Sequence, residues 1–75
     1  MNNILYYTVE KQLQDVDGIE ETTGLKTVNV YSIVDNKIVK FFDLELLNTE
    51  NTEKAINGYL EDNGYGDDVW ELKIL

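Results

Sequence analysis

The chain contains no histidine, cysteine, arginine or proline, and its only serine is Ser32. Without histidine or cysteine, neither a Ser–His nor a Cys–His nucleophile pair can form. A structural zinc site lacks its usual ligands as well. Disulfides are excluded, so the fold has to rest on packing. We therefore expect a protein that is not an enzyme and that carries no cofactor and no metal.

The charge balance is strongly acidic. Fifteen Asp and Glu residues stand against six lysines, which gives a net charge of -9 at pH 7. Nucleic acids and anionic membrane surfaces bind through clustered Lys and Arg, so we expect neither as a direct partner. The same charge favours encounter with a basic protein. It also serves to keep a small domain soluble.

Length and apolar content indicate one folded domain, residues 1–75. Leu, Ile, Val and Phe make up 24 of the 75 residues, which exceeds the level of about 20 % below which highly charged chains stay disordered. The start of the chain has no basic segment before its first apolar stretch. No apolar run approaches the roughly 18 residues of a membrane helix. We expect a cytoplasmic protein.

Hydrophobic periodicity predicts four strands and one helix in the order βββαβ. Apolar side chains alternate over residues 3–13, 25–34, 37–47 and 69–75, as in half-buried strands. Asp35-Asn36 suits a tight hairpin turn because both residues tolerate positive φ. Residues 14–24, with two glycines and four acids, are interpreted as a long loop. Strands followed by one helix favour an α+β domain with an antiparallel sheet and the helix on one face.

The helix is expected over residues 50–63, with an apolar stripe at helical spacing. Asn48 or Thr49 is the candidate N-cap, and Gly64 is the candidate terminator. Gly58 lies inside the helix and is interpreted as a close approach to the sheet. The helix is expected to cover six apolar residues of the third and fourth strands: Phe42, Leu44, Leu46, Trp70, Leu72 and Ile74.

The uncovered face of the sheet is the first candidate for an interaction surface, because exposed apolar area with a polar rim is typical of interfaces. The candidate surface comprises Val39, Phe41, Asp43, Glu45, Tyr31 and Ile33. Val28 and Val30 are the alternative contribution from the second strand. A second interpretation is that the sheet curls and that the loop over residues 15–24 or the N-terminal strand covers these residues.

Two further features are weighed. Asp15-Val16-Asp17-Gly18 begins like a calcium-binding loop, but neither register supplies the ligands and the final Glu that an EF-hand requires. Lys40 shares the alternation of the residues expected under the helix. It is interpreted as reaching the rim of the sheet or pairing with a nearby acid.

Two hypotheses for function follow. The first is a small acidic protein-interaction module, an inhibitor or adaptor that binds the basic surface of a nucleic-acid-binding protein. The second is a self-associating structural domain, a homodimer that relieves the small core of a short chain.

Overall fold

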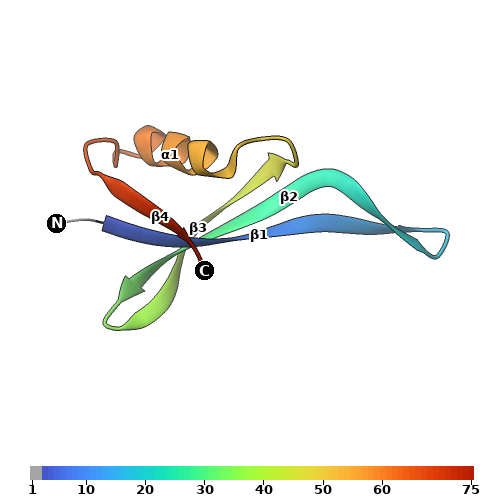
Figure 1. Ribbon diagram of the computed structural model, residues 1–75, viewed down its shortest axis with the longest axis horizontal. Coiled ribbons are helices and arrows are strands. Elements are labelled where there is room, and N and C mark those ends of the chain that lie inside the picture. The colour runs from blue at the N-terminus through green and yellow to red at the C-terminus, as the bar shows by residue number, and fades with distance from the viewer. Residues whose placement is uncertain (1–2) are drawn as a thin grey trace.

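Four strands and one helix follow one another in the predicted order βββαβ in the computed structural model, which describes residues 3–75 (Figure 1). The elements are β1 (Asn3–Val16), β2 (Ile19–Val34), β3 (Lys37–Leu47), α1 (Thr52–Asp62) and β4 (Trp70–Ile74). The bounds of β3 coincide with the prediction, whereas β1 and β2 are longer than expected.

The four strands form one mixed sheet in the order β3-β2-β1-β4. β1 pairs antiparallel with β2, and β2 pairs antiparallel with β3. β4, however, pairs parallel with β1, so the expectation of a purely antiparallel sheet was wrong. The physical reason is the connection: α1 carries the chain back to the end at which β3 began, so β4 runs in the same direction as β3.

Two tight turns close the two hairpins. Asp35 and Asn36 have φ values of 52° and 62°, which is the mirror-image turn that matches strand twist. Asp17 and Gly18, with φ values of 52° and 79°, make the same kind of turn between β1 and β2. Residues 14–24 are therefore not a loop but the far end of a long hairpin.

The ends of α1 satisfy their free backbone groups locally. The N-cap is Asn51 rather than Asn48 or Thr49, and its side chain accepts a hydrogen bond from the N–H of Lys54 at 2.9 Å. At the other end Gly64 has a φ of 85°. The N–H of Tyr65 donates to the carbonyl of Leu60 at 2.8 Å, which makes a Schellman motif.

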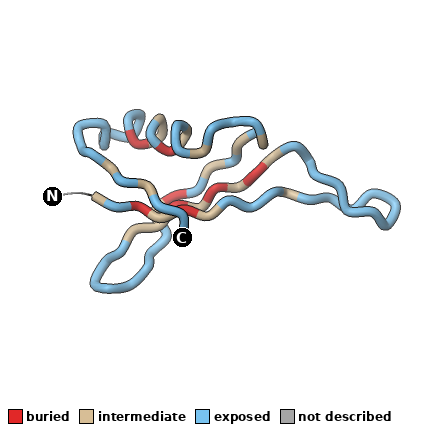
Figure 2. Tube along the Cα trace, in the orientation of Figure 1, coloured by how far each residue is buried: buried red, intermediate tan, exposed pale blue. Residues whose placement is uncertain are grey.

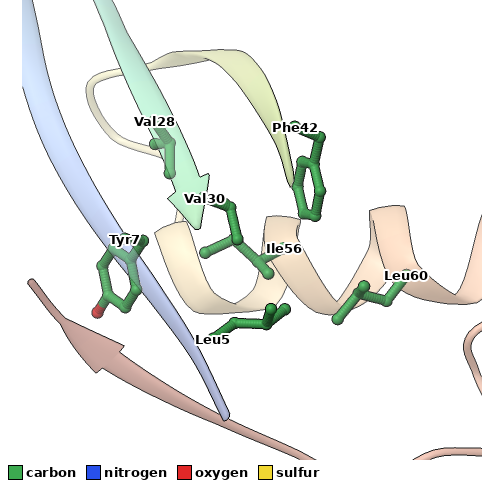
Figure 3. Packing of buried hydrophobic residues seen from close by; sticks show 7 residues of the cluster. All are labelled: Leu5, Tyr7, Val28, Val30, Phe42, Ile56 and Leu60. Carbon is green, nitrogen blue, oxygen red and sulfur yellow. The ribbon is translucent and has the colours of Figure 1, made fainter. Parts of the chain in front are cut away.

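The core is small and lies between the sheet and α1 (Figures 2 and 3). Its buried apolar residues are Leu5, Tyr7, Val28, Val30, Phe42, Ile56 and Leu60. Of the six residues expected under the helix, Phe42 is buried, four pack against the core in part, and Ile74 is 77 % exposed. Gly58 has no atom within 4 Å of the position of a Cβ, so it does not mark a close approach.

Candidate functional site

A β-bulge in β3 divides the predicted interaction surface. Asn29 lies opposite Asp43 and Val30 opposite Phe42, but Tyr31 lies opposite Lys40, so Phe41 is the extra residue. The bulge turns Phe41 away from Asp43. Its ring packs edge-on against Tyr65 at 5.5 Å between centroids, and Phe41 is partly buried against the core.

The six predicted surface residues therefore fall on two sides of the sheet. Val39 lies opposite Ser32, which shares the helix-facing side with Val30. Val39 and Phe41 were thus wrongly assigned to the face of Asp43 and Glu45. The structure keeps four of the six on the open side: Asp43, Glu45, Tyr31 and Ile33. Their role in binding stays a prediction.

The open side of the sheet is more polar than expected. Register places three rows of side chains across β1, β2 and β3: Tyr6, Tyr31 and Lys40, then Thr8, Asn29 and Asp43, then Glu10, Thr27 and Glu45. Tyrosine is enriched in protein interfaces, and two tyrosines stand in one row here. These rows offer aromatic and acidic contacts, and the exposed pair Ile33 and Ile38 adds apolar surface beyond the row of Tyr31.

Lys40 lies on this open side because of the same bulge. Its Nζ pairs with the Asp43 carboxylate at 2.8 Å, and that hydrogen bond raises the pKa of Lys40 above its usual value. The expected pairing with a nearby acid is confirmed, and the expected place under the helix was wrong. The lysine that is buried is instead Lys26, which was not singled out from the sequence. Its Nζ donates to the Glu50 carbonyl at 2.6 Å.

The second candidate site is the far end of the β1–β2 hairpin, residues 13–22, here called the arm. The register shifts between Lys11 and Leu13, and beyond that point these residues pair only with each other. The arm projects from the rest of the domain and is exposed along its length (Figures 1 and 2). Leu13, Val16 and Ile19 are 57 %, 41 % and 63 % exposed on it.

The arm is also strongly acidic, although residues 61–71 match it with five acids and no lysine. It carries four acids, Asp15, Asp17, Glu20 and Glu21, and no lysine. Asp15 and Glu20 lie directly opposite each other, an arrangement that disfavours the ribbon in isolation. A basic surface placed against the arm relieves this repulsion.

The sequence contains an indication of the arm that was missed when residues 14–24 were interpreted as a loop. Asp-Gly between alternating residues is among the strongest short-range indications of a hairpin. Asp17-Gly18 stands between Val16 and Ile19, which pair directly. The register shift near Lys11 hid the period of two, because alternation restarts on the other side of it.

Among residues 3–75, no three carboxylates gather closely enough to hold a metal ion. No helix within these residues is both long enough and apolar enough to cross a membrane.

Comparison with known proteins adds no relative. No protein-family model matches the chain, and neither curated proteins nor solved structures show significant similarity to it.

Proposed function

We propose that this protein is a non-enzymatic interaction module that binds a basic protein partner through its arm, with the acidic open face of the sheet beside it. The observation that carries this proposal is the arm itself. It projects from the domain and presents Leu13, Val16 and Ile19 to solvent. A two-stranded ribbon without further packing is at best marginally stable in water, so a binding role accounts for an arm that the fold of one chain does not require.

The domain is less compact than expected for a chain of its length, which supports the presence of a surface that a partner covers. The radius of gyration is 14.5 Å, whereas a compact chain of 75 residues has about 11 Å. The domain exposes 5509 Å², and a folded monomer of 8.7 kDa is expected to expose about 4,700 Å². The excess of about 800 Å² reflects the extended shape, to which the exposed arm contributes.

Charge favours one kind of partner. The chain carries -9 overall, and the arm has acids without a lysine. A basic protein surface complements both, speeds encounter and fixes orientation. A nucleic-acid-binding protein offers such a surface because it must itself attract phosphates. The protein then acts as an inhibitor or adaptor that occupies that surface.

A second copy of the chain is the alternative occupant. The exposed apolar side chains of the arm and the excess area fit a homodimer equally well, but each arm brings four acids to the contact. Such a dimer grows stronger as salt screens the repulsion, whereas a complex with a basic partner grows weaker. Light scattering at low and high salt separates the two: a mass of 8.7 kDa at both excludes the dimer.

The test of the proposal is affinity capture from a lysate of the native host, washed at rising salt, with the captured proteins identified by mass. We expect a basic protein that elutes with salt. The triple variant Leu13→Ser, Val16→Ser, Ile19→Ser should lose it. The control variant Val69→Ser, Ile74→Ser removes side chains that are 78 % and 77 % exposed outside the arm and should retain it.

Two double variants test the contribution of the arm's negative charge to binding. Asp15→Asn with Glu20→Gln removes two charges from the arm, and Asp67→Asn with Asp68→Asn removes two from the segment before β4. Capture should weaken much more for the first pair than for the second. Equal losses for both pairs, or full retention by the arm variants, would show that the arm is not the binding site.

A further inference from the structure

The sheet splits at the end opposite the arm. Tyr6 and Tyr31 are the last paired residues of β1 and β2 at this end. Beyond them β1 continues beside β4 alone, and β2 continues beside β3 alone. The start of β1 and the β2–β3 hairpin consequently diverge (Figure 1). Two strand edges are left facing each other without a ladder partner among residues 3–75.

A single hydrogen bond shows to which side of β1 the main-chain N–H and C=O groups of each residue point. The N–H of Leu75 donates to the carbonyl of Tyr7 at 2.9 Å, so the backbone groups of Tyr7 point toward the β4 side. Successive residues of a strand point their N–H and C=O groups to opposite sides. Those of Tyr6 therefore point toward β2, and those of Ile4 point into the gap where β2 has diverged.

The same assignment follows independently on β2. The two-residue turn at Asp35-Asn36 is closed by the directly opposed pair Val34 and Lys37, and such a closing pair exchanges both of its hydrogen bonds. Ile33, one residue before, therefore points its N–H and C=O away from β3. They face the gap from the side opposite Ile4.

A cleft of about 350 Å³ occupies this gap, and Ile4 and Ile33 both line it. Its volume is in the range of ligand-binding pockets. The aromatic residues Tyr6, Phe41 and Trp70 contribute to the wall, and none of the lining residues within 3–75 is charged. The bulge that removes Phe41 from the open face thus places it beside the cleft.

We propose that this cleft binds an extended, uncharged peptide segment of a partner protein, which pairs with the free main chain of Ile33 and Ile4 and sets an apolar side chain against Phe41 and Trp70. Unpaired N–H and C=O groups on a strand edge are what an added strand recognises. The uncharged wall explains why the segment is uncharged. This inference rests on the proposed function only in that the ligand is part of a protein; it does not depend on the arm or on a basic partner.

The experiment is a titration followed by NMR, with a capped pentapeptide of alternating threonine and valine as the probe. Because the cleft is expected to recognise the main chain of the peptide, the identity of the peptide's side chains matters little, and a simple peptide sequence suffices. We expect saturable shifts of the amide signals of Ile4 and Ile33, with those of arm residues 13–22 unchanged. The same peptide with N-methylated valines lacks the required donors and should bind at least about five-fold more weakly, as expected for one lost hydrogen bond.

A matched pair of proline variants tests the protein side. Ile33→Pro removes an N–H that faces the cleft and should weaken the peptide about five-fold. Ile38→Pro is the control, because Ile38 lies directly opposite Ile33 and its N–H faces the outer edge of β3. Affinity for the control should stay within about two-fold of the wild type, since no bond to the peptide is lost.

Two results overturn the inference: no saturable shift at Ile4 or Ile33 up to the solubility limit of the peptide, or equal binding of the methylated and unmethylated peptides. The second comparison uses wild-type protein, so it holds even where a proline variant fails to fold. Failure here leaves capture of a basic partner by the arm untouched, and failure of that capture leaves this titration unchanged.

Discussion

The hydroxyl of Tyr7 donates a hydrogen bond to Oε2 of Glu53 at 2.9 Å. This contact joins β1 to α1 across 46 positions of the chain. Tyr7 is 6 % exposed, so its ring lies in the core while its hydroxyl reaches the exposed carboxylate of the helix. The bond fixes where the first turn of α1 sits over the sheet.

Tyr7→Phe should lower the free energy of unfolding by about 1 kcal/mol, the usual net value of one hydrogen bond, because the exposed Glu53 regains water. Urea denaturation measures the change. Tyr31→Phe is the control, since no hydrogen bond of the Tyr31 hydroxyl occurs within residues 3–75. It should change stability by less than about 0.5 kcal/mol. Equal losses would mean that the Glu53 contact contributes nothing.

The same contact predicts a pH dependence. Burial, reinforced by the hydrogen bond to Glu53, raises the pKa of Tyr7 above 10.0. The folded state therefore holds this proton more tightly than the unfolded chain, whose tyrosines titrate near their usual pKa of about 10. The stabilisation is complete below that pH and is lost as the pH rises through the pKa of the folded state. Stability above about pH 10 should fall more steeply for the wild type than for Tyr7→Phe.

The small core predicts unequal tolerance to truncation. Ile56 is 0 % exposed, and Ile56→Ala should cost about 3 kcal/mol, a large part of the stability of so short a chain. Leu13→Ala, in the arm, should cost less than about 0.5 kcal/mol because that side chain is 57 % exposed. Thermal unfolding of both variants checks this. A cost for Leu13→Ala near that of Ile56→Ala would show that the arm packs on the domain.

Lys26 and Lys11 lie directly opposite each other but should behave differently. The buried Lys26 donates to the carbonyl of Glu50 at 2.6 Å and holds the segment between β3 and α1. Lys26→Met keeps the apolar stem and should cost about 1–2 kcal/mol for the lost charged donor. Lys11→Met, at an exposed position, should be neutral in chemical denaturation. Indistinguishable variants would rule out a structural role for the buried ammonium group.

Two glycines should respond in opposite directions. Gly18 has a φ of 79°, so Gly18→Ala forces an alanine into the left-handed region at a cost of about 1 kcal/mol. Gly58 lies within α1 with nothing near its missing Cβ, and Gly58→Ala should stabilise the protein by about 1 kcal/mol. Melting temperatures should shift down and up respectively. Destabilisation by Gly58→Ala would contradict the open surroundings of that position.

The parts of the fold that rest on local chemistry could be predicted from the sequence. The turn at Asp35-Asn36 and the bounds of β3 follow from residues that favour positive φ between alternating stretches. The parallel pairing of β4 depends on where α1 returns the chain, which periodicity does not record. The general preference of strand–helix–strand units for parallel strands was the available signal.

The candidate site was harder to predict, because one extra residue in a strand moves the side chains that precede it to the opposite face of the sheet. Alternation through β3 assigned Phe41 to the side of Asp43, and the bulge at Phe41, opposite the step from Val30 to Tyr31, undid that assignment for the residues of β3 that precede it. Such a bulge depends on tertiary packing, here of Phe41 against Phe42 and against Tyr65 from the segment between α1 and β4, rather than on local propensity. The arm, by contrast, was signalled by Asp17-Gly18.

The most direct measurement of the central claim is amide hydrogen exchange of the arm, residues 13–22, with and without the captured basic partner. In the free protein these amides should exchange fast, because the ribbon contacts the rest of the described chain only at its base, where Asn48 donates to Thr22 at 3.2 Å. The partner should slow them markedly while the amides of Val69 and Glu71, far along the chain, stay as they were. Arm amides that exchange equally fast in the complex, with protection appearing elsewhere, would contradict the account.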